Sequence, residues 1–553
     1  MADFKEELKK VEALALGGER PAAEARLLQL IDNNPVNSSV LRFAIVFYGN
    51  LKQFEKAIEI ALSLLKIEKY DFNLFFGKLC NGLVSHGQIG VAISAIKSFL
   101  ALKQEEAEAH FYLGMLYKKQ GTYDKAVSEF ELAVKSDYRD QCECYLLIAL
   151  MYVELRMEEK AIFYLHKVLD IKPQHYEALF NLASLEQAKG NKDKAIELYQ
   201  QVIKLNPKLV EALVRVIYAK KIKESDHELL KMINRRFRSS QTTMLDKESL
   251  KYAEGKALDD LKQYDKAFAA YEYANKLNAE RIQKYEPKTI EQFVKLSVEV
   301  ISKDWLGKHH ELEDVKPVFI VGHFRSGSTL VEQILSRHSQ ITALGEIEYF
   351  TRHYYENFNR YWEKLKPAIN NVFLSGCAEG YIHLIQSMNI NTQCFTDKRP
   401  ENILFMGLIK KLFPDAKFIH TTRNLLDNGL SVYFQQLNDL STFSTSLEDF
   451  FHYNQQCDSL MAHWRSLFGE DIHEVPYEQM VNAPEDTAQN MVKNIGLEWE
   501  SDCMNFKTSE RFVRTASISQ VRKEVYTTSV RRWKNYEPYL SDKLKLLFQS
   551  HMV

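Results

Sequence analysis

The sequence lacks any run of about 18 or more consecutive apolar residues, the length that a membrane-spanning helix needs. Its first ten residues, MADFKEELKK, contain no apolar segment of the kind found in a secretory leader, so we expect neither a leader nor a membrane partner. Charge of one sign is also lacking: 72 Lys and Arg face 74 Asp and Glu, for a net charge of −2. No global field favours nucleic acid or an acidic membrane, so any anion must be bound by local basic clusters.

Cysteine is sparse as well, with 7 residues scattered over 553. Cys142 and Cys144 form a Cys-x-Cys pair without a second pair nearby, which is neither a zinc framework nor a disulfide scaffold. This pattern indicates a reducing compartment. The hydrophobic fraction of 46% and the charged fraction of 26% are typical of globular proteins, and the length predicts about two to four domains.

Alanine recurs at a nearly constant interval in the first half of the chain. The positions are Ala23, Ala57, Ala92, Ala126, Ala161 and Ala195, at intervals of 34, 35, 34, 35 and 34 residues. A period of about 34 is typical of the tetratricopeptide repeat, a helix–turn–helix unit. Gly114 precedes Ala126 by 12 residues and Phe130 follows it by 4, as expected where small residues let two helices cross closely.

Residues 208–244 fall out of phase, and we expect a degenerate repeat or an irregular connector there. The pattern returns at Gly255 and Ala267, so we place the repeat array at residues 1–285 and a helical linker at 286–316. The concave groove of such an array can bind a protein partner, and it can equally serve as a scaffold or a dimerisation arm. The oligomeric state stays open.

Strand and helix patterns alternate over residues 317–553. The candidate strands are Val318–Gly322, Cys394–Asp397, Lys417–Thr422 and Ile472–Pro476, and the intervening helices include Glu401–Leu412 and Asp427–Leu437. This alternation predicts an α/β domain with a parallel sheet and helices on both faces. Ligands of such sheets bind at the carboxyl ends of the strands.

The first of these strands leads into a glycine-rich turn and then an amphipathic helix. Gly322 and Gly327 let the backbone turn tightly, and the N–H groups at the start of the helix can bind an anion. The G-x-x-x-x-G spacing is that of a P-loop, but Ser328 stands where the nucleotide-binding Lys is expected. This absence argues against ATP or GTP hydrolysis and leaves phosphoryl transfer as a second hypothesis.

Arg325-Ser326-Gly327-Ser328-Thr329-Leu330 resembles the 5′-phosphosulfate loop of the sulfotransferases, with Phe324 in place of the usual Pro. These enzymes use 3′-phosphoadenosine-5′-phosphosulfate (PAPS) as the donor. Arg423 and Ser431, eight residues apart, resemble the 3′-phosphate-binding segment of that family. An Arg fork and a hydroxyl can hold a terminal phosphate from two directions.

Two further segments resemble the catalytic parts of the family. Lys398 lies in TDKRPEN, which is similar to the D-K-x-P-x-N segment of bacterial repeat-containing sulfotransferases, and it would reach the bridging oxygen or the sulfonate of PAPS. Glu346 matches the general base of tyrosylprotein sulfotransferases, with Glu348 as a competitor for that role. The Arg that grips acidic substrates in those enzymes is missing after Glu346, which leaves the acceptor open.

The last part of the chain supplies four more candidates. Tyr477 matches a family Tyr that lies by the adenine. Ser517 and Lys523, with Arg522, match a family segment that approaches the phosphosulfate.

By these motifs the chain is identified as a member of the tetratricopeptide-repeat-containing sulfotransferases, and its domain at 317–553 is similar to tyrosylprotein sulfotransferases. The resemblance implies PAPS as co-substrate, adenosine 3′,5′-bisphosphate (PAP) as product and no metal. Glu346 would be the general base. Arg325, Lys398 and Lys523 would offset the negative charge that develops on the leaving phosphate.

The acceptor implied by the resemblance is a hydroxyl, with a protein tyrosine as one possibility. A saccharide or small metabolite is the alternative acceptor, and a non-catalytic interaction protein is the alternative to an enzyme. Animal tyrosylprotein sulfotransferases carry a membrane anchor that this sequence does not show, so we expect a bacterial cytoplasm.

Overall fold

The computed structural model describes residues 2–307, 316–356, 370–386, 394–508, 529–542 and 544–545, together with Met388, Ile390 and Thr392. The chain divides into two compact units, residues 1–178 and residues 179–553. We call these the N-terminal unit and the C-terminal unit. No helix among the described residues combines the length and the apolarity that crossing a membrane requires.

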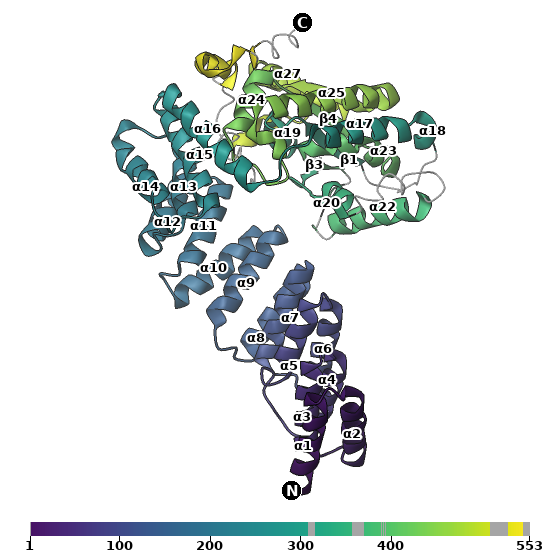
Figure 1. The fold of residues 1–553 in the computed structure, drawn as a ribbon. Coiled ribbons are helices and arrows are strands. Elements are labelled where there is room, and N and C mark those ends of the chain that lie inside the picture. Colours follow the sequence, from purple (N-terminus) through teal and green to yellow (C-terminus); the bar gives the residue numbers. More distant parts are fainter. Residues whose placement is uncertain are drawn as a thin grey trace. The chain divides into compact units, whose positions relative to one another are not determined.

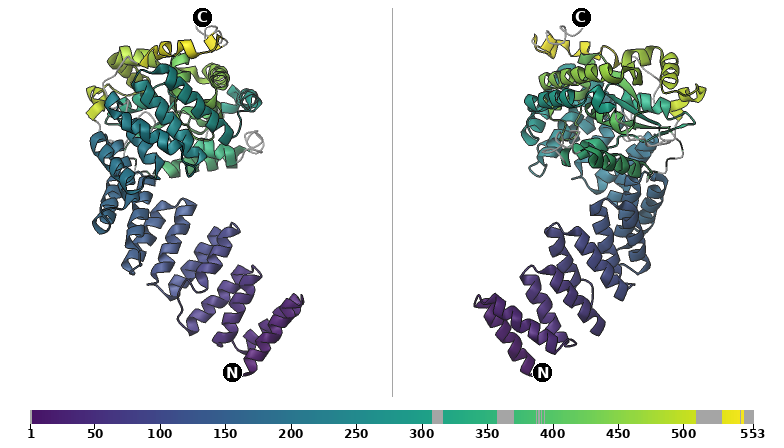
Figure 2. Two further views of the ribbon diagram at one scale, coloured as in Figure 1. Left: turned by 60° about the vertical axis from the view of Figure 1, so that its left-hand side comes forward. Right: turned by 90° about the vertical axis from the view of Figure 1, so that its right-hand side faces the viewer.

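The N-terminal unit consists of helix pairs stacked one after another (Figure 2). The helices are α1 (Ala2–Leu16), α2 (Arg20–Asn33), α3 (Ser38–Asn50), α4 (Phe54–Ile67), α5 (Phe76–Ser85), α6 (Ile89–Leu102), α7 (Ala107–Gln120), α8 (Tyr123–Lys135), α9 (Gln141–Glu154) and α10 (Glu158–Ile171). From α1 to α9 the pairs share one continuous apolar core of aliphatic, aromatic and alanine side chains.

The periodic alanines explain this stacking. Each lies in the second helix of a pair and has no exposed surface, as found for Ala23, Ala57, Ala92, Ala126, Ala161 and Ala195. A Cβ atom on Gly114 would lie 2.7 Å from the ring of Phe130, so only glycine fits at this crossing. The predicted tetratricopeptide architecture is confirmed.

Helix pairs continue into the C-terminal unit as α11 (Tyr176–Lys189), which begins just before the division, α12 (Lys192–Leu205), α13 (Val210–Ala219), α14 (His227–Phe237), α15 (Met244–Asp260) and α16 (Tyr264–Arg281). The out-of-phase residues 208–244 form α13 and α14, which pack with α15 around Ile217 and Ile233. The repeat pattern is therefore irregular here because a 3₁₀ turn at Glu224–Asp226 separates the two helices.

A five-stranded parallel sheet in the order β2-β3-β1-β4-β5 forms the centre of the rest of this unit. The strands are β1 (Lys316–Gly322), β2 (Ile341–Ala343), β3 (Cys394–Lys398), β4 (Lys417–Thr422) and β5 (Ile472–Pro476). The four predicted strands are present. β2 was not predicted, because three residues are too few to show a strand period.

Helices cover both faces of the sheet, as predicted, because alternate residues of β1 point to opposite sides. Phe319 and Val321 belong to the larger apolar core, and Val318 and Ile320 belong to a second one. The larger core contains α17 (Pro287–Val300), α18 (Lys303–Leu306), α20 (Tyr349–Glu356), α22 (Asn370–Gln386), η3 (Pro400–Phe405), α23 (Met406–Leu412), η4 (Thr442–Thr445) and α25 (Leu447–Phe468). The second contains α19 (Ser328–Leu335), α26 (Tyr477–Asn482), α27 (Pro484–Asn494) and η6 (Ser501–Thr508).

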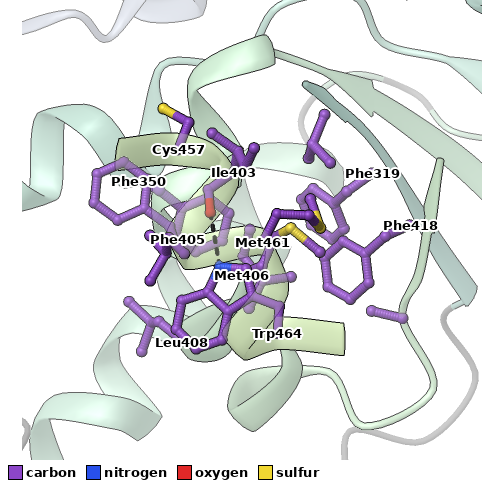
Figure 3. Close-up of a cluster of buried hydrophobic side chains, with 14 of the residues drawn as sticks. Phe319, Phe350, Ile403, Phe405, Met406, Leu408, Phe418, Cys457, Met461 and Trp464 are labelled. Atoms are coloured by element: carbon purple, nitrogen blue, oxygen red, sulfur yellow. Dashed lines mark hydrogen bonds between the residues drawn. The ribbon is translucent and has the colours of Figure 1, made fainter. Parts of the chain in front are cut away.

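Trp464 lies at the centre of the larger core (Figure 3). Its indole Nε1 donates to the carbonyl of Ile403 at 2.9 Å, and a Cβ atom on Gly407 would lie 2.7 Å from its ring. A single helix was predicted at Glu401–Leu412, whereas the chain forms the 3₁₀ helix η3 and then α23. The chain changes from a 3₁₀ helix to an α-helix at Met406, shortly after the Ile403 carbonyl that Trp464 binds.

The last repeat pair, α15 and α16, packs directly on α24 (Leu425–Tyr433). The ring of Tyr271 stacks on Phe434 with centroids 4.1 Å apart. The buried side chain of Asn275 donates to the carbonyl of Tyr433 at 2.8 Å and accepts from the hydroxyl of Tyr252 at 2.8 Å. α24 therefore ends at Tyr433, before the predicted end at Leu437.

Helix α17 lies inside the predicted linker 286–316, yet Ile290, Phe293 and Val294 are part of the larger core. Figure 1 shows α17, in teal, among the helices and strands of the sheet-containing part. The predicted domain boundaries stay predictions, and the observed packing gives residues 286–307 a share in the core.

The segment after Ser529 is held by two carboxylates. Asp427 on α24 accepts the backbone N–H groups of Arg531 and Trp533 at 2.6 and 2.8 Å. Asp259 on α15 accepts from the guanidinium of Arg532 and from the hydroxyl of Tyr536. The short helices η8 (Arg532–Asn535) and η9 (Glu537–Tyr539) are thereby fixed against both the last repeat pair and α24.

We expect Asn275→Ala to lower the free energy of unfolding by about 1–3 kcal/mol, because the buried hydroxyl of Tyr252 and carbonyl of Tyr433 both lose a partner. Urea denaturation of the full chain measures the effect. The exposed neighbour on the same helix provides the control, and Lys276→Ala should change stability by less than about 0.5 kcal/mol. Equal stability of the two variants would contradict a structural role for the Asn275 contacts.

Asp397 on β3 provides a pH test of the same core. Burial raises the pKa of its carboxyl from 3.8 to about 7, although Tyr381 donates to Oδ2 at 2.9 Å. A raised folded pKa means that stability present below about pH 4 is lost as the pH rises through about 7. We expect Asp397→Asn to reduce this loss, by roughly 1.4 kcal/mol for each unit by which the pKa differs.

Thermal unfolding of the two proteins between about pH 4 and pH 8 measures this difference. The control is Asp415→Asn, which changes an exposed carboxylate and should keep the wild-type pH profile. Parallel profiles for Asp397→Asn and the wild type would show that this carboxyl does not titrate as its burial predicts.

Candidate active site

The turn between β1 and α19 is fixed by backbone geometry at two glycines. Gly322 has a φ of +143°, and a Cβ atom there would lie 2.2 Å from the carbonyl oxygen of Thr421. Gly327 has a φ of +100° and is the N-cap of α19. The hydroxyl of Ser326 donates to the carbonyl of His323 at 2.6 Å and lies 2.6 Å from Oγ1 of Thr421. These contacts hold the loop against the end of β4.

This loop directs the N-terminus of α19 to the carboxyl edge of the sheet. Ser328 and Thr329 form the first turn of the helix and are buried. The first turn of a helix leaves backbone N–H groups without partners inside the helix and carries a partial positive charge. The position is suited to a phosphate or sulfate group.

Arg325, Arg423, Ser431 and Tyr477 meet beside this turn. Nε of Arg325 donates to Oγ of Ser431 at 3.2 Å, and Nη1 of Arg423 donates to the carbonyl of Arg325 at 3.1 Å. The ring of Tyr477 lies under the Arg423 guanidinium at 4.7 Å and would be 2.8 Å from a Cβ atom on Gly327. Residues from three separate segments of the sequence are thus in one place.

Arg423 could instead have formed an ion pair with Asp427, one helical turn away. Within the described residues these two side chains form no such pair, because Asp427 accepts from the backbone of residues 531 and 533. Nη2 of Arg423 donates to the carbonyl of Ser529 at 2.8 Å, and its buried Nε has no partner in the described part of the chain. A partly buried guanidinium with a remaining donor fits an anionic ligand.

Lys398 and Glu346 form an ion pair at the neighbouring strand end. The Lys398 side chain is only 1% exposed, whereas that of Glu346 is 44% exposed. The N–H of Lys398 also donates to the carbonyl of Gly345 at 2.8 Å. The carboxylate can therefore meet a molecule from solvent while the ammonium group stays inside.

Glu332 of α19 connects this pair to the glycine-rich loop, and the sequence analysis did not identify it. Its carboxylate accepts from the N–H of Gly345 at 2.8 Å and from the hydroxyl of Thr396 at 3.2 Å. The available signal was a charged residue between Val331 and Ile334 on an otherwise apolar helix face. Such a residue indicates a buried hydrogen-bonded role.

Arg399 was also missed, although it directly follows Lys398. Its buried guanidinium donates to Glu348 at 3.2 Å and to Glu401 at 3.3 Å. Burial raises the pKa of Glu401 above its ordinary value, and the charge of Arg399 opposes that rise. Glu348, the competitor of Glu346, is thus paired with a different cation.

The predicted residues fall into two adjacent groups. The loop residues Ser326, Gly327, Ser328 and Thr329 lie with Arg325, Arg423, Ser431 and Tyr477, and Glu346 lies with Lys398. Ser517, Arg522 and Lys523 lie outside the described residues. Among those that are described, no cluster of three or more His, Cys, Asp or Glu side chains could hold a metal ion.

The comparisons with protein families agree with this organisation. Residues 317–501 match the sulfotransferase family. Residues 79–140, 143–175 and 176–209 match tetratricopeptide repeats.

Two related sequences and one solved structure are similar to parts of this chain. An uncharacterised protein of Aquifex aeolicus (strain VF5) is 27% identical over 76% of this chain and 56% of its own length. A Caenorhabditis briggsae protein named "Putative protein-tyrosine sulfotransferase" is 22% identical over 42% of this chain and 84% of its own length. The sulfotransferase domain of the Synechococcus PCC 7002 olefin synthase is 16% identical, covers 44% of this chain and 98% of its own, and has a TM-score of 0.33.

The chain thus spans little more than half the length of the Aquifex protein. The repeat matches end at residue 209, within the helix pairs, and the sulfotransferase match begins at residue 317, in the first strand of the sheet. Residues 317–501 form a domain of the sulfotransferase family, and tetratricopeptide repeats precede it in the chain.

Proposed function

We propose that this protein transfers a sulfuryl group from PAPS to an acceptor hydroxyl. The observation that supports it most directly is the meeting of Arg325, Arg423 and Ser431 at the first turn of α19, inside a domain of the sulfotransferase family. When bound, PAPS supplies the sulfuryl group: the acceptor oxygen bonds to sulfur, the bond from sulfur to the bridging phosphate oxygen breaks, and PAP leaves.

The chain's own residues fit a donor with two anionic ends. The loop Ser326, Gly327, Ser328, Thr329 and the N-terminus of α19 would hold the 5′-phosphosulfate. Arg423 and Ser431 would hold the 3′-phosphate, and the ring of Tyr477 would lie by the adenine. We place Ser517 and Lys523 near the phosphosulfate on the resemblance alone.

Glu346 takes the proton of the acceptor hydroxyl in this proposal, because its carboxylate is partly exposed while facing Lys398. Arg325, Lys398 and Lys523 offset the negative charge that develops on the leaving phosphate. These side chains supply the charge that a metal ion supplies in many phosphoryl transferases, so the proposal needs no metal. The remaining contribution is positioning of the two reactants.

A protein tyrosine is one acceptor that the proposal includes, in line with the name of the Caenorhabditis relative. A saccharide or a small metabolite is the other, since residues 347–350, which directly follow Glu346, contain no Arg to bind acidic peptide residues. The repeat groove could present a peptide or bind a separate protein. All seven cysteines are free and buried, which supports a reducing compartment such as the bacterial cytoplasm.

Calorimetric titration with PAP in the absence of magnesium tests the donor site. We expect the wild type to bind, and Arg423→Ala to weaken binding by about 10- to 100-fold, the scale of a lost charged hydrogen bond. Arg235→Ala removes an exposed guanidinium on α14 and should leave the affinity unchanged. Absence of PAP binding by the wild type would contradict the proposal and leave the repeats as the functional part.

A matched pair of variants tests the general base. We expect Glu346→Gln to lower turnover by about 10²-fold or more while PAP affinity is unchanged, because the proton acceptor is lost. Glu348→Gln removes the carboxylate that pairs with Arg399 and should cost much less. Radiolabelled PAPS turnover measures both, and a larger loss in Glu348→Gln would transfer the role to that residue.

A further inference from the structure

A cavity of about 470 Å³ lies beside the glycine-rich loop in the C-terminal unit. We propose that it is the acceptor site and that it takes a small uncharged molecule with an apolar, ring-containing body and a hydroxyl group. The inference rests on the proposed sulfuryl transfer and names the class of acceptor for that reaction. It favours a small molecule over an acidic tyrosine peptide.

The first argument is the position of the cavity relative to the reactive residues. Phe324, which lines it, directly precedes Arg325, and Arg399 directly follows Lys398. Thr351 on α20 also lines it, and this helix begins three residues after Glu346. The cavity therefore borders the three segments that carry the candidate catalytic side chains, while Arg325, Glu346 and Lys398 themselves are not among its lining residues.

The second argument is the chemistry of the walls. Aromatic rings form two groups there, and within each group the rings are in contact. On one side, Phe443 stacks on Tyr453 with centroids 4.0 Å apart and contacts Phe324 at 5.4 Å. On the other, Phe293 lies 5.3 Å from Tyr354 and 6.0 Å from Phe405. Such walls bind planar or alicyclic apolar groups, and the volume is in the range that holds small ligands.

Charge is the third argument, because, of the two cations in the lining, only the exposed Lys284 has no ion pair among the described residues. The guanidinium of Arg399 is already bound by Glu348 and Glu401. Three carboxylates line the cavity, Glu286, Glu401 and Asp439, against the two cations Lys284 and Arg399, and Asp439 is itself paired with Arg281 at 2.7 Å. Carboxylates of an acidic substrate would meet like charge, which costs affinity.

The segment that joins the repeats to the sheet builds one wall of this cavity. Tyr285, Ile290 and Phe293 line it and are buried in the larger core. The hydroxyl of Tyr285 is fixed by a contact with Nδ1 of His452 at 2.9 Å. The acceptor site therefore includes residues outside 317–501, the part that matches the sulfotransferase family.

An exposed residue at the rim gives a test with little risk to the fold. Thr289 on α17 lines the cavity and is exposed, so Thr289→Trp would fill its entrance. Its neighbour Lys288 is exposed and does not line the cavity, which makes Lys288→Trp the matched control. The probes are 2-naphthol, an uncharged ring alcohol, and a tyrosine peptide flanked by glutamates.

We expect 2-naphthol to bind to the PAP-loaded wild type by calorimetry and to accept sulfate with a kcat/KM at least about tenfold above that of the peptide. Thr289→Trp should lower kcat/KM for 2-naphthol by about tenfold or more while PAP affinity is unchanged, and Lys288→Trp should match the wild type.

Three results would overturn the inference: preference for the acidic peptide, no binding of 2-naphthol to the PAP-loaded protein, or equal 2-naphthol kinetics in the two Trp variants. Each of these leaves PAP binding intact. Failure of the wild type to bind PAP at all would instead contradict the proposed function, so the two failures can be told apart.

Discussion

The close parallel pairing of β1 with β4 is the constraint on which the candidate site depends. Gly322 lies opposite Thr421 in the register, and the carbonyl of Thr421 occupies the space of a Cβ atom. This approach lets the loop after β1 reach the side chains after β4, so that Arg423 donates to the backbone of Arg325. A larger residue at 322 would push the two strand ends apart and separate the residues proposed to hold the two ends of the donor.

The last repeat pair has a second structural role, because it is part of the same compact unit as the sheet. Its helix α16 holds the end of α24 through Asn275 and Tyr271, and α24 carries Ser431. Asp259 and Asp427 fix the residues after Ser529, whose carbonyl accepts from Arg423. The helix pair thus holds in place α24 and the residues after Ser529, which flank the candidate 3′-phosphate site.

The ion pair of Lys398 and Glu346 is a second constraint on the candidate site. Burial of an unpaired ammonium group would be costly, and the partly exposed carboxylate offsets its charge without taking it into solvent. Glu332 accepts the N–H of Gly345 and so positions the backbone beside the pair, and Arg399 donates to the neighbouring carboxylate of Glu348. Two of the residues that organise this site were not found in the sequence, because their importance comes from contacts between distant segments.

The sequence alone predicted the repeat period, the four longer strands and the position of the glycine-rich loop. These features are local: a fixed spacing of alanines, a buried apolar run and two glycines define them without knowledge of distant residues. The short strand β2 was missed because three residues show no strand period, whereas the 3₁₀ start of the 400–412 segment and the early end of α24 accompany tertiary contacts of the Ile403 and Tyr433 carbonyls.

In the candidate site, too, some features were found from the sequence and others only from the structure. Arg325, Glu346, Lys398, Arg423 and Ser431 were identified from their motifs, which keep a fixed spacing next to the strands. The pairing of Lys398 with Glu346, the linking role of Glu332 and the aromatic cavity built with α17 were decided only by the tertiary structure. The physical reason is that side-chain pairing and cavity walls depend on distances between segments far apart in the chain, and these are fixed only when the parallel strands and their covering helices pack together.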